Sequence, residues 1–355
     1  MDVDYLIVGQ GLAGSLLACL LLQRQRRVLV IDDGHRTAAS LAAAGIINPI
    51  TGKRLTRPQL VDDLLNHAYS TYPDLERFLG ARFFARRVVQ RMLVSEAEAR
   101  LWRERRGDPE YRRHLGQPDD PLPPGMRSDH GAFSIATAAQ LDVPAFLAAT
   151  QRLLRAGGCL REGHFEHTAV WADENGAGYQ DVRCRFVIFC EGYRMTDNPA
   201  FNAIELNPAK GEILGVEAPS FVSDRIFQGG KWLFRNLNGR VLAGTTYSWD
   251  ALNEQPTDGA RDQIQHGLRQ FYTEPCRVIW QRAGVRPIIR VDNRPVTGVH
   301  PAHPRLAILN GLGSKGALQA PFAAKQLIAK LEENQYIHPH IDVCRVSLWN
   351  KRRFA

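Results

Sequence analysis

Three glycines near the start of the chain, Gly9, Gly11 and Gly14, have the spacing G-x-G-x-x-G. They follow the apolar run 5–9 and precede the apolar run 15–22, so the pattern predicts a buried strand, a tight turn and a helix. Gly9 would permit the turn, and Gly11 would let a pyrophosphate approach the backbone. Gly14 would let the helix pack closely on the strand, with its free N–H groups facing the phosphates. The turn predicts a dinucleotide-binding unit.

A second apolar run, residues 27–31, ends at Asp32, 18 residues after Gly14. A carboxylate at this place can accept hydrogen bonds from a ribose diol, and it disfavours a 2′-phosphate, so NADP is not expected. The alternative is a chance glycine turn in an α/β protein.

The composition limits the class of protein. The chain has 355 residues and 44% hydrophobic residues, enough for one large domain or two intimate ones, and global disorder is excluded. Its six cysteines are scattered without a C-x-x-C pair, so we expect reduced thiols and no metal site. The start carries Asp2 and Asp4, and the longest apolar run near it, residues 16–22, has seven residues. Neither a signal peptide nor a membrane span is predicted, and the expected location is the cytoplasm.

The net charge of +8 raises the question of an anionic partner. Arginine concentrates between residues 82 and 113, but acidic residues such as Glu96 and Glu104 are interleaved there. A solvated charged face explains this pattern better than a nucleic-acid surface. We therefore expect no DNA partner, and the pattern disfavours RNA.

The rest of the chain alternates between helical and strand patterns. The expected helices are residues 58–79, 142–156 (with Asp142 as N-cap), 261–272 and 317–332; the expected strands are 83–94, 165–171, 186–190, 211–216, 231–235, 240–244 and 306–310. The last strand and helix return the chain to the nucleotide-binding unit. The predicted fold class is α/β (α+β), with a Rossmann-like dinucleotide-binding domain interleaved with a mixed-β-sheet domain. The predicted limits are 1–58, 136–200 and 284–335 for the first domain, 59–135 and 201–283 for the second, and 336–355 for a C-terminal tail.

Several motifs occur in a specific order. They are residues 8–14 (VGQGLAG), 43–46 (AAGI), 165–170 (FEHTAV), 190–192 (CEG), 283–287 (AGVRP) and 311–316 (GLGSKG). In this order and spacing the sequence resembles the D-amino-acid oxidase (DAO) superfamily of FAD-dependent oxidoreductases, nearest the glycine oxidase and sarcosine oxidase branch. The resemblance covers most of the chain and is poorest over residues 60–140.

The resemblance implies a set of FAD-binding residues. They are Gly9, Gly11, Leu12, Ala13, Gly14, Asp32, Asp33, Ala39, Ser40, Ala44, Gly45, Ile46, Val170, Gly192, Gly311, Gly313, Ser314, Lys315, Gly316, Ala317 and Leu318. The turn before the last helix would lie under the N1–C2=O edge of the flavin, where helix N–H groups stabilise negative charge. The sarcosine branch binds its flavin through a cysteine after the R-P pair. This chain has Ile288 and Ile289 there, so non-covalent FAD is expected.

Arg286 is the implied ligand of a substrate carboxylate, because a guanidinium can make two parallel hydrogen bonds to it. The alternative for Arg286 is an ion pair with a nearby acid. Trp232, Tyr247 and Ser314 are further candidates for the substrate pocket. Trp232 and Ser314 stand where the glycine oxidase branch has a tyrosine and an arginine, which puts glycine or sarcosine specificity in doubt.

The implied reaction is oxidation of the C–N bond of an amino acid or secondary amine, with hydride transfer to flavin N5 and hydrolysis of the imine. The expected partners are that small molecule and O2 or another electron acceptor. No histidine receives an acid or base role. Three alternatives stay open: a dehydrogenase using a quinone or protein acceptor, with the basic tail 349–354 near a membrane surface; a tRNA-modification-type amine oxidase; and a non-catalytic flavin-binding protein.

Overall fold

The first apolar run forms an inner strand of a six-stranded sheet. In the computed structural model, which describes residues 1–35, 38–116 and 122–346, the strand order is β16-β17-β10-β1-β2-β6. These strands are β1 (Tyr5–Val8), β2 (Val28–Asp32), β6 (Leu160–Glu162), β10 (Phe186–Phe189), β16 (Val296–Val299) and β17 (Leu306–Asn310). All pairs are parallel except β16 with β17. All four residues of β1 are buried, as expected for a parallel strand covered on both faces.

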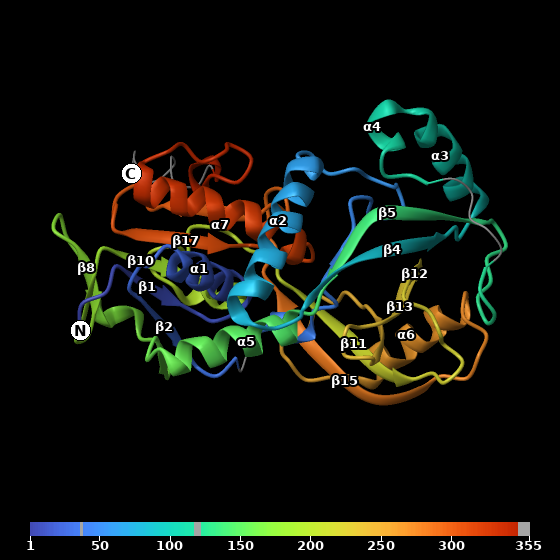
Figure 1. The fold of residues 1–355 in the computed structure, drawn as a ribbon, viewed down its shortest axis with the longest axis horizontal. Helices are drawn as coiled ribbons and strands as arrows, with labels where there is room; N and C mark the ends of the chain where they lie inside the picture. The colour runs from blue at the N-terminus through green and yellow to red at the C-terminus, as the bar shows by residue number, and fades with distance from the viewer. Residues whose placement is uncertain (36–37, 117–121, 347–355) are drawn as a thin grey trace.

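Helices cover one face of this sheet and a small sheet covers the other (Figure 1). The helices are α1 (Leu12–Gln23), α2 (Val61–Leu79), α5 (Val143–Ala156) and α7 (Gly316–Glu333). The small sheet contains β7 (Val170–Ala172), β8 (Ala177–Tyr179) and β9 (Val182–Cys184). Tyr5 and Ile7 pack in the helical core, whereas Leu6 and Val8 pack toward the small sheet, so alternate residues of β1 fill two cores.

A second, eight-stranded sheet forms the other half of the molecule (Figure 1). Its order is β15-β11-β14-β13-β12-β4-β5-β3, made of β3 (Ile46–Ile47), β4 (Phe84–Met92), β5 (Ala132–Leu141), β11 (Ala209–Glu217), β12 (Ile226–Gly229), β13 (Lys231–Arg235), β14 (Val241–Gly244) and β15 (Arg277–Arg286). The pair β12–β4 is parallel and the other pairs are antiparallel, so the sheet is mixed, as predicted. The helix α6 (Asp258–Arg269) packs on one face, and α3 (Glu96–Gly107), followed by the short α4 (Pro109–Arg112), packs on the other.

The predicted fold class is confirmed, and several predicted boundaries are corrected. The helix α1 begins at Leu12, not at residue 15, because the turn ends at Gly11, its N-cap. The predicted strand 165–171 is a 3-10 turn at His167–Ala169 followed by β7, because Phe165 stacks on Tyr179 with ring centroids 4.3 Å apart. The helix α6 begins earlier than predicted, because the Thr257 side chain accepts a hydrogen bond from the Ala260 N–H.

Other predictions hold or stay open. The Asp142 side chain caps α5 by accepting from the Ala145 N–H at 3.1 Å. The strands β5 and β15 run across the predicted domain limits at 135/136 and 283/284, and those limits stay a prediction. The tail segment 349–354 lies outside the described residues. No helix in the described part of the chain is long and apolar enough to cross a membrane.

Candidate FAD and substrate site

A cavity of about 910 Å³ lies between the two sheets, at the carboxyl ends of β1, β2, β10 and β17. Open α/β sheets bind their ligands at this edge. Most of the predicted residues line it: Gly9, Gly11, Leu12, Ala13, Asp32, Asp33, Ala39, Ser40, Ala44, Gly45, Ile46, Gly192, Trp232, Tyr247, Arg286, Gly313, Ser314, Lys315, Gly316, Ala317 and Leu318. Gly14, Val170 and Gly311 are not among the lining residues.

The glycine turn leaves one end of the cavity open to a ligand. Gly9 has a φ of +95°, and a Cβ there would lie 2.6 Å from the Cys190 carbonyl oxygen. A Cβ on Gly14 would lie 1.9 Å from the Gly9 carbonyl oxygen, so its role is the close helix–strand packing that the pattern predicts. At Gly11 the nearest atom to a Cβ is Ser40 Oγ, at 3.5 Å. Ser40 Oγ also accepts from the Leu12 N–H at 3.1 Å, at the start of α1.

Asp32 is held in place at the end of β2 by backbone groups. Its Oδ2 accepts from the Gln10 N–H at 2.7 Å, and its Oδ1 accepts from the N–H groups of Gly34 and His35 at 2.9 and 2.8 Å. The carboxylate therefore has a fixed orientation at the cavity wall, which suits an acceptor for a ribose diol.

The sequence did not predict a histidine–carboxylate pair at the same end of the cavity. His167 Nε2 lies 2.6 Å from Glu191 Oε1, and Asn198 Nδ2 donates to Glu191 Oε2 at 2.7 Å. The hydrogen bond to Glu191 raises the pKa of His167. His167 and Glu191 are 24 residues apart, and no local pattern connects them.

The loop before α7 forms the opposite wall. The Gly313 N–H donates to the Pro287 carbonyl oxygen at 3.0 Å, so this loop is tied to the segment that carries Arg286. Lys315 is the N-cap residue of α7, and burial lowers the pKa of its ammonium group. Lys315 and the first turn of α7, residues 316–318, therefore line the cavity at a helix N-terminus.

Arg286 lies in the cavity at the end of β15 without a carboxylate partner. Its Nη2 donates to Thr245 Oγ1 at 2.9 Å and its Nη1 to the Thr246 carbonyl oxygen at 3.2 Å. No ion pair among the described residues includes Arg286. Within this part of the chain, Arg286 therefore does not form the structural ion pair that was the alternative interpretation. Burial lowers the pKa of the guanidinium. A guanidinium has five N–H donors, so donors remain for an anion that enters the cavity.

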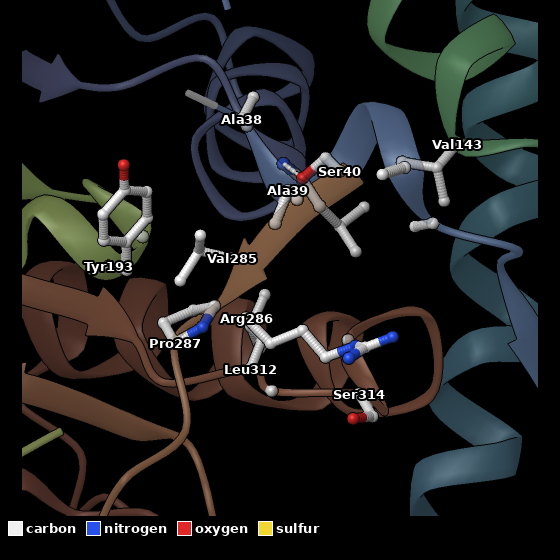
Figure 2. Close-up of a pocket in the computed structure, with 18 of the residues that line it drawn as sticks. Ala38, Ala39, Ser40, Val143, Tyr193, Val285, Arg286, Pro287, Leu312 and Ser314 are labelled. Carbon is white, nitrogen blue, oxygen red and sulfur yellow. Dashed lines mark hydrogen bonds between the residues drawn. The ribbon is translucent and has the colours of Figure 1, made fainter. Parts of the chain in front are cut away.

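An aromatic residue covers the guanidinium. The Arg286 Cζ lies 4.3 Å from the Tyr247 ring centroid, and the Tyr247 hydroxyl and Ser314 Oγ are 2.7 Å apart. Figure 2 shows the Arg286 side chain extending toward Ser314. Tyr247 therefore connects the eight-stranded sheet to the loop before α7 across the cavity, and it holds the arginine by a cation–π contact.

Glycines make room for these side chains. A Cβ on Gly211 would lie 1.8 Å from Arg286 Nη2, and a Cβ on Gly244 would lie 2.5 Å from Trp232 Cζ2. Register pairs Gly211 with Gly284, so the floor beneath the guanidinium has no side chain. The sequence did not predict this floor, because the register decides which residues face each other.

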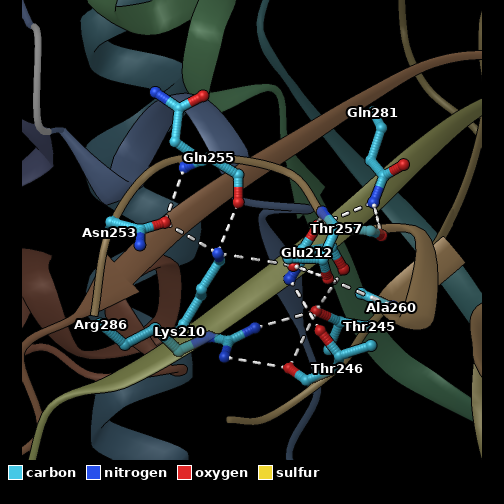
Figure 3. Close-up of polar contacts among 10 residues, drawn as sticks. All are labelled: Lys210, Glu212, Thr245, Thr246, Asn253, Gln255, Thr257, Ala260, Gln281 and Arg286. Carbon is cyan, nitrogen blue, oxygen red and sulfur yellow. Dashed lines mark hydrogen bonds and ion pairs between the residues drawn. The ribbon is translucent and has the colours of Figure 1, made fainter. Parts of the chain in front are cut away.

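A buried polar network lies behind Arg286 (Figure 3). Lys210 Nζ donates to Asn253 Oδ1 at 2.9 Å and lies 3.8 Å from Glu212 Oε1. The Glu212 carboxylate accepts from the Thr257 N–H and hydroxyl, both at 2.9 Å, and from Gln281 Nε2 at 2.7 Å. Lys210 and Glu212 are each 2% exposed. Thr245 Oγ1 donates to the Glu212 carbonyl oxygen at 2.9 Å, so Glu212 binds both ends of the segment 245–257, which carries the groups that contact Arg286.

The residues fit FAD on independent structural grounds. An open glycine turn at a helix start, an oriented carboxylate and a second helix start line one cavity. No cysteine lies in the segment after Pro287, where Ile289 is fully buried. In residues 1–35, 38–116 and 122–346, no three His, Cys, Asp or Glu side chains gather as a metal site would require.

Comparison with known proteins agrees with this assignment. A family model described as FAD dependent oxidoreductase (DAO) matches residues 4–331. Similar solved structures include glycine oxidase from Geobacillus kaustophilus (22% identity, 98% of each chain, TM-score 0.79). They also include iminodiacetate oxidase from Chelativorans sp. BNC1 (22% identity, 94% of this chain and 96% of that chain, TM-score 0.76) and L-proline dehydrogenase from P. horikoshii (12% identity, 99% and 98%, TM-score 0.78).

These structures share the fold, and the family match extends over nearly the whole chain, including the glycine turn, Arg286 and the loop before α7. The chain therefore belongs to the DAO family of FAD-dependent oxidoreductases, and its cofactor is FAD.

Proposed function

We propose that the protein oxidises the C–N bond of an amino acid or a secondary amine that carries a carboxylate. The observation that carries this proposal is Arg286, a partly buried cation in the cavity with no carboxylate partner in the described chain. Two of the similar oxidases support it by their names, since glycine and iminodiacetate both contain a carboxylate next to the carbon that bears nitrogen.

The roles of the chain's residues follow from their positions. Arg286 would bind the substrate carboxylate, while Tyr247 and Trp232 would confine the rest of the molecule and exclude water. FAD, when bound, supplies the two-electron acceptor. The neutral amine loses a hydride from carbon and releases a proton from nitrogen to solvent, which leaves an imine, and water hydrolyses the imine to a carbonyl compound and ammonia, or an amine where the substrate is a secondary amine.

No protein base is required in this scheme. Three histidines line the cavity at its nucleotide end: His35, His164 and His167. His35 Nε2 is 2.9 Å from the Gln10 carbonyl oxygen, His164 follows Gly163, whose N–H donates to the Asp32 carbonyl oxygen, and His167 contacts Glu191. None of them contacts Arg286 in the described structure. We therefore assign the histidines to the nucleotide end and propose direct hydride transfer from a neutral amine.

Further features of the proposal concern the cofactor and its reoxidation. Ile288 and Ile289, not a cysteine, directly follow Pro287, which supports non-covalent FAD. We propose O2 as the electron acceptor. We also propose a reducing compartment such as the cytoplasm, because all six cysteines are unpaired. A quinone or protein acceptor is the alternative, and a dehydrogenase is among the similar structures.

The test is an anaerobic absorbance titration of the FAD-loaded protein with amines, N-methyl amino acids and D- and L-amino acids. Loss of the flavin band, at about 450 nm, identifies a substrate. Arg286→Ala should abolish bleaching by substrates that carry a carboxylate and spare amines that lack one. Arg290→Ala is the control, because Arg290 is exposed, lies in the following segment and pairs with Glu205 at 3.1 Å.

The other outcomes distinguish the alternatives. Bleaching that persists in Arg286→Ala would contradict the role of the arginine. A flavin that no amine reduces would favour a non-catalytic protein, and a salt-dependent gel shift with tRNA would favour the RNA-modifying alternative. Reoxidation by a quinone but not by air would identify a dehydrogenase.

A further inference from the structure

Charge is divided along the cavity. The acidic residues that line it lie at the end of β2 or in the segments that follow β2 and β10; they are Asp32, Asp33, Glu191 and Asp197. Toward the eight-stranded sheet the lining residues include two cations, Lys231 and Arg286, and no acid.

Lys231 is a half-buried lysine with no carboxylate partner among the described residues. Its Nζ donates to the Thr245 carbonyl oxygen at 2.7 Å, its one hydrogen bond in the described structure. An ammonium group has three N–H donors, so two remain. Gly267 of α6 leaves space for the stem, because a Cβ there would lie 2.4 Å from Lys231 Cγ. Burial lowers the pKa of the ammonium group, because it disfavours the charged form. An anion beside the group would favour the charged form again.

Lys231 and Arg286 meet at one residue. Lys231 contacts the carbonyl oxygen of Thr245, and Arg286 contacts the hydroxyl of the same residue. Lys231 begins β13, next to the tight turn at Gly230, and Trp232 follows it in the strand. The two cations therefore border the same end of the cavity, from β13 and from β15.

The pair of unneutralised cations suggests a second anion site beside the first. Burying a charge without a partner costs free energy, and a ligand that brings the counter-charge removes that cost. A substrate with one carboxylate would satisfy Arg286 alone. Gln228 and Gln263 also line this end of the cavity and can donate further hydrogen bonds to an oxygen.

We propose that the substrate carries a second carboxylate, bound by Lys231, and that the preferred substrate class is a short dicarboxylic amine or amino acid. This inference rests on the proposed function, because it assumes that Arg286 binds the first carboxylate. In this proposal, Lys231 determines substrate specificity and takes no part in the chemical step.

The test compares two unreactive ligands that differ by one carboxylate. Methoxyacetate and diglycolate have an ether oxygen in place of the amine nitrogen, so neither is oxidised. Binding to the FAD-loaded protein is measured by isothermal titration calorimetry and by the perturbation of the flavin spectrum. We expect diglycolate to bind about tenfold more tightly, or about 1.4 kcal/mol.

Variants assign the preference to one side chain. Lys231→Met should bring the affinity ratio close to one, and Lys231→Arg should retain most of it. Lys325→Met is the matched control, because Lys325 is also a partly buried lysine with a pKa lowered by burial, but it does not line the cavity. Lys325→Met should keep the full preference.

Two results would overturn the inference in different ways. Binding of methoxyacetate with no preference for diglycolate, or a preference that survives in Lys231→Met, refutes the second anion site and leaves the proposed function intact. If neither ligand binds, and if Arg286→Ala has no effect on flavin bleaching by substrates that carry a carboxylate, the proposed function and this inference are refuted together.

Discussion

The floor beneath Arg286 allows a sharp test, the substitution Gly211→Ala. A Cβ at this position would lie 1.8 Å from Nη2 and 2.0 Å from Cζ of Arg286. Since optimal contacts between heavy atoms lie near 3.5–4.0 Å, the guanidinium must move by on the order of 2 Å. The clash is with the end of a flexible side chain, so the backbone can stay in place.

The displacement should affect ligand binding much more than stability. It separates Arg286 from Thr245 Oγ1 and from the Thr246 carbonyl oxygen, which now lie at 2.9 and 3.2 Å. A hydrogen bond to a charged group contributes about 1.5–3 kcal/mol, so loss of the guanidinium contact with a carboxylate can weaken binding by about 100-fold. We therefore expect methoxyacetate to bind about 100-fold more weakly, or about 2.7 kcal/mol, by calorimetry with the FAD-loaded variant.

Gly215→Ala is the control on the same strand. A Cβ at Gly215 would lie 2.0 Å from Trp280 Cε2, so this variant also creates a clash, but with a side chain that does not line the cavity. It should lower the melting temperature and leave affinity for the carboxylate ligand intact. Normal ligand affinity in Gly211→Ala would refute the assignment of Arg286, in its present position, to the carboxylate.

Three further expectations concern stability and the cofactor. Glu212→Gln leaves the buried Lys210 ammonium without its carboxylate, so urea denaturation should show that the free energy of unfolding falls by about 3–5 kcal/mol. The control Glu217→Gln, at an exposed ion pair on the same strand, should lower it by less than about 1 kcal/mol. His167 has a raised pKa, so its pairing with Glu191 stabilises the fold fully below the ordinary value of about 6.5 and this contribution is lost as the pH rises through the raised value. His167→Gln should therefore lower the melting temperature more at pH 6 than at pH 9, and an equal effect at both would contradict the assignment. Acid precipitation should release all the FAD into the supernatant, and yellow protein in the pellet would show a covalent bond.

The features that the sequence predicted are those encoded locally. The spacing of Gly9, Gly11 and Gly14 determines a strand, a turn and a helix within fourteen residues, and the structure has all three. The family resemblance pointed to Arg286 and to the loop before α7, and both line the cavity.

The features that were missed depend on the pairing of distant strands. Gly211 has no local signal, because its role comes from the register of β11 with β15. Lys231 and the Glu212 network are likewise recognisable only after folding, when α6 and the segment 245–257 come beside them. A charged residue in a strand pattern looks the same in sequence whether it is exposed or buried with partners.

The interleaved chain path has a consequence for biosynthesis. β10 lies between β1 and β17, and the opposite wall of the FAD cavity comes from residues 313–318. During synthesis, which proceeds from the N-terminus, the glycine turn emerges before β10, and β10 keeps an unpaired edge until β17 has been made. Capture of FAD between the two walls therefore follows the synthesis of residues 313–318, and a cell short of flavin would accumulate chains in which the strands on the two sides of the cavity are held together by protein contacts alone.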